Sequence, residues 1–305
     1  MSAPNLDIIN EINRLKKQKN AVILVHNYQR PEVQDIADFI GDSLELSQKA
    51  VKTEAEVIVF CGVHFMAETA HIVNPGKTVL LPDNESGCPM ANMITPEALI
   101  ARKKELPGAI VVCYVNSSAA VKAETDICCT SANAVRVVQS LPADKEILFV
   151  PDQYLGQWVN EKTGRQMYLW PGFCPTHMRI LGDDILREKK NHPGAIALVH
   201  PECRPDAKAV ADEVMSTGGM IRFVHENKAQ EFIIGTEIGI IYRLKKENPG
   251  KTFIPATDKA VCPNMKKITL EKVLRSLQEN RYIITVPEDI RIGALNSVNR
   301  MLAIG

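Results

Sequence analysis

The chain has 305 residues, of which 45% are hydrophobic and 24% are charged, so it is long enough to bury a large core and to form two or three small domains. Lysine plus arginine and aspartate plus glutamate both total 36, and no basic run stands out, which argues against an extended surface for nucleic acid or for an anionic membrane. No segment approaches 18 uninterrupted apolar residues, and the N-terminus has an amphipathic helix pattern rather than that of an export signal, so we expect a soluble, cytoplasmic protein with no membrane or nucleic-acid partner.

The first 92 residues predict a unit in which strands and helices alternate. After a leading helix near 5–19, strands are expected near 22–26, 38–41, 57–60 and 78–81, and helices near 31–36, 43–53 and 64–72. Strands separated by helices form parallel sheets that carry helices on both faces.

The same pattern recurs twice more along the chain. Three apolar strands are each followed by a polar triad, and the triads begin 88 and 86 residues apart: His26-Asn27-Tyr28, Tyr114-Val115-Asn116 and His200-Pro201-Glu202. Seventeen residues after each triad begins, a hydroxyl residue suited to a helix N-cap follows, at Ser43, Ser131 and Thr217. Regular periods indicate duplicated units. We predict an α/β chain of three similar αβα domains with small parallel sheets, arranged around a pseudo-threefold axis, at 1–92, 93–177 and 178–265.

Later segments are assigned by their place in the repeat. Helices near 95–105 and 178–190 lead into the second and third units, and 220–224 is predicted to be helical because of its phase, although its composition suits a strand. The tail, 266–305, is expected to hold one more helix and a strand at 282–286, and to pack back against the first domain.

Three of the eight cysteines share one position in the repeat. Cys88, Cys174 and Cys262 lie 62, 60 and 62 residues after the start of their triads, and each is followed by proline, unlike the other five. Cysteines in a reducing compartment serve as metal ligands, nucleophiles or small buried residues. We therefore predict that these three are metal ligands and that the other five are buried thiols.

Three thiolates leave a metal centre one protein ligand short of four, which is typical of a catalytic site. One cysteine per repeat unit favours a [4Fe–4S] cluster with an open iron, while zinc with three cysteines and a water stays an alternative. Two other functions are compatible with composition: an iron–sulfur hydro-lyase of the aconitase kind, and a small-molecule binding protein with structural cysteines. The absence of a CxxC pair argues against the hydro-lyase.

At these positions the chain resembles the quinolinate synthase family, on motifs that span nearly its whole length: His26-Asn27-Tyr28, Gly41-Asp42-Ser43, Gly87-Cys88-Pro89-Met90, Tyr114-Val115-Asn116, Gly172-Phe173-Cys174-Pro175-Thr176-His177, His200-Pro201-Glu202-Cys203, Ser216-Thr217 and Cys262-Pro263-Asn264-Met265. The resemblance implies an enzyme of NAD biosynthesis that condenses iminoaspartate with dihydroxyacetone phosphate to quinolinate, phosphate and water. It also implies that the three cysteines hold a [4Fe–4S] cluster. A further expected partner is the enzyme that supplies iminoaspartate, L-aspartate oxidase or dehydrogenase. The substrate contacts that it implies are His26, Ser43, Tyr114, Asn116, Ser131, His200, Glu202 and Thr217.

The residue chemistry suggests roles for these side chains. Proton transfers in such a reaction need acids and bases, for which Tyr28, Glu202, His26 and His200 are the candidates. His177, three residues after Cys174, is near enough to reach the metal centre or the substrate, and we include it among the substrate-binding residues. Helix N-termini capped by the three hydroxyl residues would offer backbone donors to anionic groups. Burial is expected to raise the pKa of Glu202.

Overall fold

The protein is built from three small parallel sheets. The structure is a computed structural model that describes residues 3–304. The first unit runs α1 (Ala3–Gln18), β1 (Ala21–His26), α2 (Pro31–Asp35), β2 (Phe39–Gly41), α3 (Ser43–Lys52), β3 (Val57–Cys61), α4 (His64–Val73), β4 (Thr78–Leu80) and the short 3₁₀ helix η1 (Ala91–Met93). These elements lie where the sequence places them.

The other two units repeat this order. The second runs α5 (Pro96–Glu105), β5 (Ile110–Tyr114), α6 (Ala119–Ala123), β6 (Ile127–Cys129), α7 (Ala134–Gln139), β7 (Ile147–Val150), α8 (Gln153–Thr163), β8 (Tyr168–Leu169) and η2 (His177–Arg179). The third runs α9 (Gly182–Asn191), β9 (Ile196–Val199), α10 (Pro205–Ala209), β10 (Glu213–Val214), α11 (Thr217–Glu226), β11 (Glu231–Gly235), α12 (Ile240–Glu247), β12 (Thr252–Pro255) and η3 (Met265–Lys267). Residues 220–224 are helical, as their repeat phase predicts.

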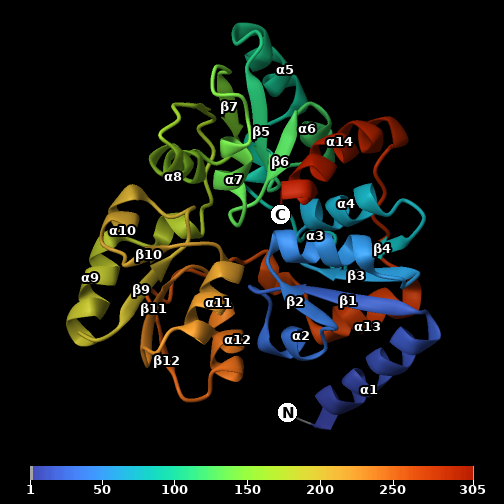
Figure 1. Ribbon diagram of the computed structural model, residues 1–305. Helices are drawn as coiled ribbons and strands as arrows, with labels where there is room; N and C mark the ends of the chain where they lie inside the picture. The colour runs from blue at the N-terminus through green and yellow to red at the C-terminus, as the bar shows by residue number, and fades with distance from the viewer. Residues whose placement is uncertain (1–2, 305) are drawn as a thin grey trace.

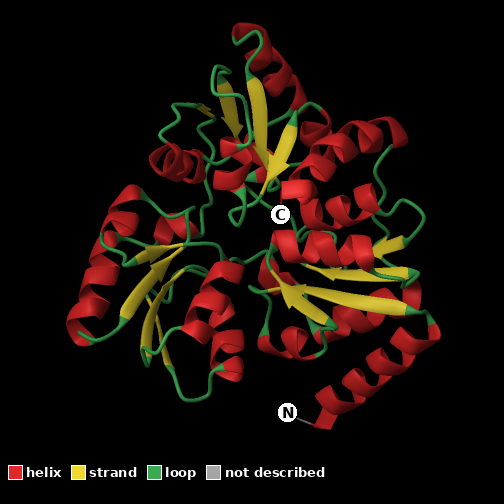
Figure 2. Cartoon of the chain, in the orientation of Figure 1, coloured by secondary structure: helices red, strands yellow, loops and turns green. Residues whose placement is uncertain are grey.

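All three sheets share one strand order. In sequence numbering they read β2-β1-β3-β4, β6-β5-β7-β8 and β10-β9-β11-β12, and every pairing within them is parallel. The chain leaves the first strand in one direction and the third strand in the other, so a crevice opens between their carboxyl ends, where open α/β sheets bind ligands. Figure 1 shows the three sheets arranged around a common centre, and the arrowheads in Figure 2 point toward that centre. The predicted fold class is therefore confirmed.

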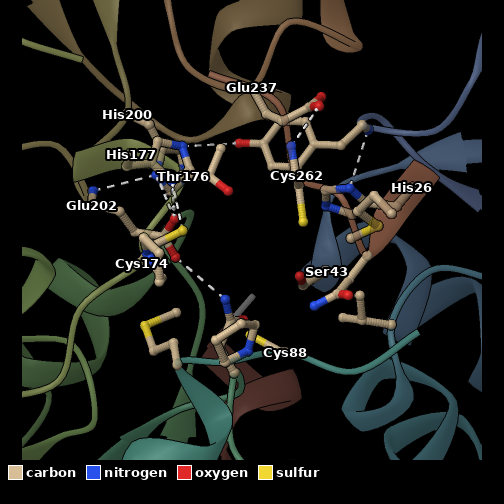
Figure 3. Close-up of a pocket in the computed structure, with 18 of the residues that line it drawn as sticks. His26, Ser43, Cys88, Cys174, Thr176, His177, His200, Glu202, Glu237 and Cys262 are labelled. Atoms are coloured by element: carbon tan, nitrogen blue, oxygen red, sulfur yellow. Dashed lines mark hydrogen bonds and ion pairs between the residues drawn. The ribbon is translucent and has the colours of Figure 1, made fainter. Parts of the chain in front are cut away.

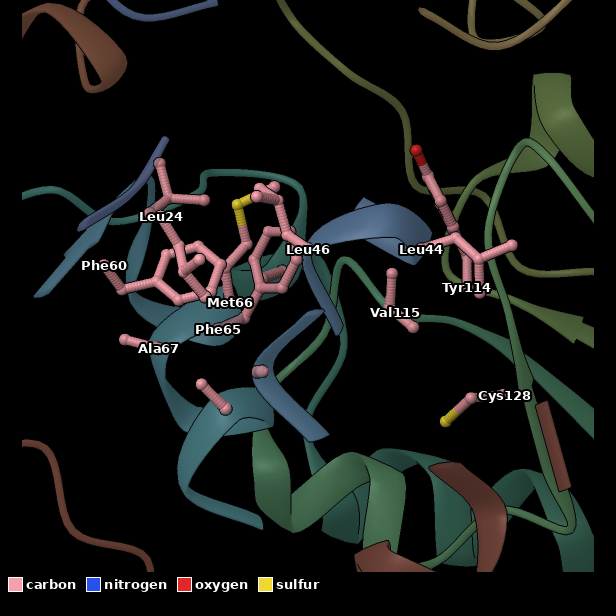
Figure 4. Close-up of a cluster of buried hydrophobic side chains, with 14 of the residues drawn as sticks. Leu24, Leu44, Leu46, Phe60, Phe65, Met66, Ala67, Tyr114, Val115 and Cys128 are labelled. Atoms are coloured by element: carbon pink, nitrogen blue, oxygen red, sulfur yellow. The ribbon is translucent and has the colours of Figure 1, made fainter. Parts of the chain in front are cut away.

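Alternating side chains cover both faces of the third sheet. Ala197, Val199 and Ile233 join a small core with Ile180 and Ile185 of the chain around α9. Their neighbours on the same strands face the large core that extends through the other two units. Part of that large core is drawn in Figure 4, where Phe65 and Met66 pack among buried leucines. The same two side chains also line the central cavity, so the core forms one of its walls.

The tail differs from its predicted structure. It forms two helices, α13 (Leu270–Glu279) and α14 (Glu288–Ile304), whereas residues 282–286 form no strand. Ile283 makes an isolated antiparallel bridge with Leu80, and backbone hydrogen bonds join Tyr282 to Leu81 and Ile284 to Val79.

The two tail helices pack on different units. Helix α13 packs against α1 and β3 of the first unit, and α14 lies against α6 and β6 of the second unit and α4 of the first. The domain boundaries drawn from the sequence stay a prediction. Within residues 3–304, no helix combines the length and apolar character needed to cross a bilayer.

Candidate active site

A cavity of about 300 Å³ lies where the three units meet, at the carboxyl ends of their strands. All three predicted metal ligands line it, together with every other residue predicted for the site: His26, Tyr28, Ser43, Tyr114, Asn116, Ser131, His177, His200, Glu202 and Thr217. Figure 3 shows the labelled members of this set around one space, with Cys88, Cys174 and Cys262 approaching from different elements. The repeat phase thus identifies side chains that converge although up to 236 positions separate them in sequence (Cys262 from His26).

The three cysteines share a local structure that explains the proline after each of them. Each Cys-Pro pair leads into a short 3₁₀ helix that begins three residues after the cysteine, η1, η2 or η3. Proline suits the first position of such a turn, since that N–H has no partner there. The next backbone N–H groups donate hydrogen bonds to the sulfur, from Ala91 and Met90 to Cys88 and from Met265 and Asn264 to Cys262. Such donors stabilise a thiolate and tune a bound cluster.

Burial disfavours the thiolate form of these three sulfurs. Burial raises the pKa of Cys88 to about 12, and it also raises the pKa values of Cys174 and Cys262. A bound metal would therefore displace three protons, as thiolate ligation requires. The other five cysteines, Cys61, Cys113, Cys128, Cys129 and Cys203, are fully buried in or beside strands and do not line the cavity.

The donor set fits a cluster of several irons better than a single ion. Three sulfurs from three separate units face a space of about 300 Å³, and backbone N–H groups are already directed at them. A mixed set, Cys174, His177 and Glu202, also brings its ligand atoms within 4.8 Å of one another. However, His177 Nδ1 lies 2.7 Å from Glu202 and 3.1 Å from Cys174 Sγ, which are hydrogen-bonding distances.

Two histidines at equivalent strand ends are held as neutral donors. The backbone N–H of Tyr28 donates to His26 Nδ1 at 3.2 Å, and that of Glu202 donates to His200 Nδ1 at 3.3 Å. Nδ1 is therefore the acceptor in both rings, and Nε2 carries the proton. Desolvation by burial lowers the pKa of each histidine to about 3. His200 Nε2 lies 3.1 Å from the Ser131 hydroxyl, so that hydroxyl is held by the histidine of another unit.

Glu202 is an anion, contrary to the expectation from sequence. Burial alone would raise its pKa, but attraction by His177 and His200 and hydrogen bonds from His177 and Tyr114 outweigh burial and lower the pKa to about 2. Since His200 is neutral, the close contact with His177 is the main cause. The expectation of a raised pKa rested on burial, and nothing in the sequence places the His177 imidazole against this carboxylate.

A chain of hydrogen bonds joins Tyr28 to Glu202. The Tyr28 hydroxyl lies 2.5 Å from Thr236 Oγ1, which lies 2.9 Å from His177 Nε2. With His177 Nδ1–H donating to Glu202, every link has one donor and one acceptor. Burial raises the pKa of Tyr28 well above its ordinary value, so the phenol keeps its proton. Thr236 is absent from the sequence prediction because it follows the third strand of its unit, whereas the triads follow the first.

The three hydroxyl residues line the cavity but are not the helix caps. Asp42 caps α3, and its carboxylate accepts from the N–H groups of Leu44 and Glu45 at 3.0 Å. Ser216 caps α11, and Asn133 occupies the cap position of α7. The cap predictions for Ser43, Ser131 and Thr217 are therefore wrong. Asp42 and Ser216 already accept from the backbone donors at the starts of α3 and α11, and Ser131 lies two positions before Asn133, whose side chain accepts from Thr130 rather than from α7. Ser43 and Thr217 instead lie one position inside their helices.

Two charged residues that the repeated triads do not predict also line the cavity. Arg179 is the only lysine or arginine that lines the cavity within the described part of the chain, and Glu237 is the only glutamate there besides Glu202. Glu237 lies two residues after the end of β11, and Val63, which also lines the cavity, lies two residues after the end of β3. The residues that follow the third strand of each unit could therefore have been predicted as cavity residues from the repeat. One predicted residue has an unused hydrogen-bond acceptor. The Asn116 amide N–H donates to Glu202 at 3.3 Å, while its buried Oδ1 has no hydrogen-bond partner.

Comparison with known proteins gives a consistent result. The model of the family described as quinolinate synthetase A protein matches residues 10–303. Relatives named quinolinate synthase, from Dehalococcoides mccartyi strain CBDB1 and Desulforudis audaxviator, are each 57% identical, with 97% and 98% of this chain covered and 98% of each relative. A quinolinate synthase 1 from Methanosarcina acetivorans is 54% identical over 98% of both chains. A solved Plasmodium falciparum E-1-hydroxy-2-methyl-but-2-enyl-4-diphosphate reductase aligns at 12% identity and a TM-score of 0.30, over 95% of this chain and 85% of that one, which is too weak a likeness to support an argument.

Proposed function

Because the chain belongs to the quinolinate synthetase A family, we propose that this enzyme of NAD biosynthesis condenses iminoaspartate with dihydroxyacetone phosphate to give quinolinate, phosphate and water. The observation that carries the proposal is the convergence of Cys88, Cys174 and Cys262, one from each unit, on a cavity that also holds neutral imidazole donors and a buried carboxylate.

The three cysteines would hold a [4Fe–4S] cluster. When bound, a cluster with one iron free of protein ligands supplies Lewis-acid chemistry suited to the loss of a hydroxyl group. The described residues provide three sulfurs for it, and the side chains nearest Cys174 are engaged in hydrogen bonds among themselves. All eight cysteines are free thiols, which suits the reducing cytosol that we propose as its location.

The chain's own residues would bind and orient two anionic substrates. The Nε2–H groups of His26 and His200 can donate hydrogen bonds to carboxylate or carbonyl oxygens without adding charge. Arg179 at the cavity wall supplies the positive charge that a phosphate or carboxylate requires. Asn116 Oδ1, which lacks a partner, is placed to accept from an amino or imino N–H.

Proton transfer would run along the hydrogen-bonded chain between Glu202 and Tyr28. Glu202, an anion at neutral pH, can accept a proton from substrate carbon or nitrogen, and Tyr28 holds a proton that it can donate. Thr236 and His177 lie between them, and with these donors a proton can shift from Tyr28 toward Glu202 as each group passes its hydrogen to the next.

One anaerobic experiment tests the cofactor and the activity together. Protein purified without oxygen should be brown, absorb broadly near the violet and contain about four irons per chain. Mixed with chemically generated iminoaspartate and dihydroxyacetone phosphate, it should release quinolinate and phosphate in equal amounts. A colourless, zinc-containing protein would overturn the cluster, and a brown protein that forms no quinolinate would overturn the reaction. If iminoaspartate must be delivered directly, adding L-aspartate oxidase or dehydrogenase with aspartate should raise the rate above that with free iminoaspartate.

A further inference from the structure

An ion pair between a buried glutamate and a partly exposed lysine adjoins one of the proposed cluster ligands. Lys266 Nζ lies 3.0 Å from one carboxylate oxygen of Glu237 and 3.2 Å from the other. The Glu237 side chain is 0% exposed and that of Lys266 is 19% exposed. A buried pair of this kind loses much hydration, so it persists only where further hydrogen bonds satisfy both groups.

The Glu237 carboxylate accepts hydrogen bonds from the backbone of Cys262 and of Gly239. Its Oε1 accepts from the N–H of Cys262 at 3.1 Å, and its Oε2 accepts from the N–H of Gly239 at 2.7 Å. The carboxylate therefore connects the end of β11 to the residue that presents a sulfur to the cavity. It also places a negative charge beside that sulfur.

Lys266 carries the connection across to the first unit. Its Nζ donates to the backbone carbonyl of Tyr28, and its own carbonyl accepts from Arg30 Nε at 2.7 Å. Gly239 leaves the room for this contact, since a Cβ there would lie 2.6 Å from Lys266 Nζ and 2.7 Å from both Glu237 Oε2 and the Tyr28 carbonyl. The two ends of the connection are thus Cys262 and Tyr28, which belong to different units.

We propose that Glu237 and Lys266 are positioning residues that fix Cys262 and Tyr28 relative to each other and balance the charge beside the metal centre. The inference rests on the proposed cluster. Lys266 does not line the cavity, and Glu237, which does, acts here through its hydrogen bond to the backbone of Cys262. The lysine cancels the charge of the glutamate, so removing one partner alone leaves a buried charge next to a sulfur ligand.

The test compares three changes at the pair with a matched neighbour. Lys267 lies one position away and pairs with the exposed Glu85 at 3.2 Å, so Lys267→Met removes the same charge without touching the buried pair. Iron content, the EPR spectrum and midpoint potential of the dithionite-reduced cluster, kcat and KM are measured for Lys266→Met, Glu237→Gln, the double variant and Lys267→Met.

Lys266→Met should make the midpoint potential more negative, because it leaves the glutamate charge uncompensated, and Glu237→Gln should make it more positive. The double variant should return close to the wild-type potential, since the net local charge is restored. Because Lys266→Met also releases the Tyr28 carbonyl, we expect kcat to fall at least tenfold while KM changes by less than about threefold. Lys267→Met should match the wild type in every measurement.

If Lys266→Met binds no iron, Lys266→Arg, which keeps the positive charge, shows whether the lost charge is the cause. Full iron in the arginine variant and none in the methionine variant would support the charge pair, whereas loss of iron in both would overturn it. A potential and kcat in Lys266→Met equal to those of Lys267→Met would also overturn it. Failure of the wild type to bind iron would instead count against the proposed cofactor, so the two failures are distinguishable.

Discussion

His177 Nδ1 lies 2.7 Å from a carboxylate oxygen of Glu202, and both side chains are almost fully buried. This contact outweighs the effect of burial and lowers the pKa of Glu202 to about 2. The pair therefore presents an ionised carboxylate at neutral pH, next to a ring that also contacts Cys174. Two consequences concern the proposed proton transfers.

Replacing Glu202 by glutamine should remove the base and keep the shape of the site. We expect turnover to fall by at least about a hundredfold, the usual scale for the loss of a general base, with iron content unchanged. Quinolinate formation and iron are measured together, with Glu85→Gln, an exposed glutamate, as the control. Near-normal turnover with only a raised KM would make Glu202 a residue that positions substrate.

Thr236→Val should interrupt the chain between Tyr28 and His177 while keeping side-chain volume. The hydroxyl lies 2.5 Å from the Tyr28 oxygen and 2.9 Å from His177 Nε2, and valine offers neither a donor nor an acceptor. We expect kcat to fall by about tenfold to a hundredfold and a solvent isotope effect on kcat to change, since proton transfer is affected. Thr163→Val, which removes a hydroxyl that donates to the Val159 carbonyl and accepts from the Arg165 N–H at the end of α8, is the matched control. Unchanged kcat and isotope effect would rule out the relay.

The neutral histidines should make the protein sensitive to mild acid. The pKa of His200 in the folded state is about 3, below the unfolded value of 6.5, so its contribution to stability is present above pH 6.5 and is lost as pH falls toward 3. When the pH falls from 7 to 5, the free energy of unfolding of the His200→Asn variant should drop by about 2 kcal/mol less than that of the wild type.

Urea unfolding at the two pH values measures this difference. His225→Asn, at an exposed position of α11, should leave the pH dependence unchanged. An equal pH dependence in wild type and His200→Asn would contradict the assignment of a neutral, buried imidazole.

The three cysteines that share the repeat phase should be the only cluster ligands. Alanine at position 88, 174 or 262 should abolish or sharply reduce bound iron, because each of these positions supplies one of the three cysteine thiols that line the cavity among the described residues. Cys128→Ala, at a fully buried position in β6, should keep a full cluster. Iron analysis and absorbance of anaerobically reconstituted protein decide the point. A full cluster in any of the three variants, or its loss in Cys128→Ala, would contradict the assignment.

Periodicity explains why so much of the fold and cavity was accessible from sequence. Because three units repeat one strand order, a residue at the end of β1 predicts the places of its counterparts after β5 and β9. That logic located His26, Tyr114 and His200, but it depends on residues that share a phase. The helix α14 has no counterpart in the repeat, so periodicity does not predict that it packs against α6 and β6 of the second unit.

Unit-specific contacts explain the errors at the site. The pKa of Glu202 depends on His177, which comes from a different part of the repeat, and no period relates the two. At α3 and α11 the caps were misplaced by one residue, because Asp42 and Ser216 precede Ser43 and Thr217, and aspartate, serine and threonine all favour helix starts. Which of two adjacent candidates caps a helix is decided by backbone geometry, and sequence pattern alone does not resolve one residue.

Arg179 should govern the affinity for an anionic substrate. It is the only lysine or arginine lining the cavity in residues 3–304, and the neutral His26 and His200 supply hydrogen bonds without positive charge. A charge-assisted hydrogen bond contributes about 1.5–3 kcal/mol, so Arg179→Met should raise the KM of one substrate by roughly tenfold to a hundredfold. Since the side chain extends from η2 and makes one long hydrogen bond, at 3.3 Å to the Lys259 carbonyl, kcat at saturation should change little. Steady-state assays that vary iminoaspartate and dihydroxyacetone phosphate in turn identify which substrate is affected, with Arg187→Met on the exposed face of α9 as the control. If both KM values stay within twofold of the wild type, the anionic groups are bound by the neutral donors and the metal centre without help from Arg179.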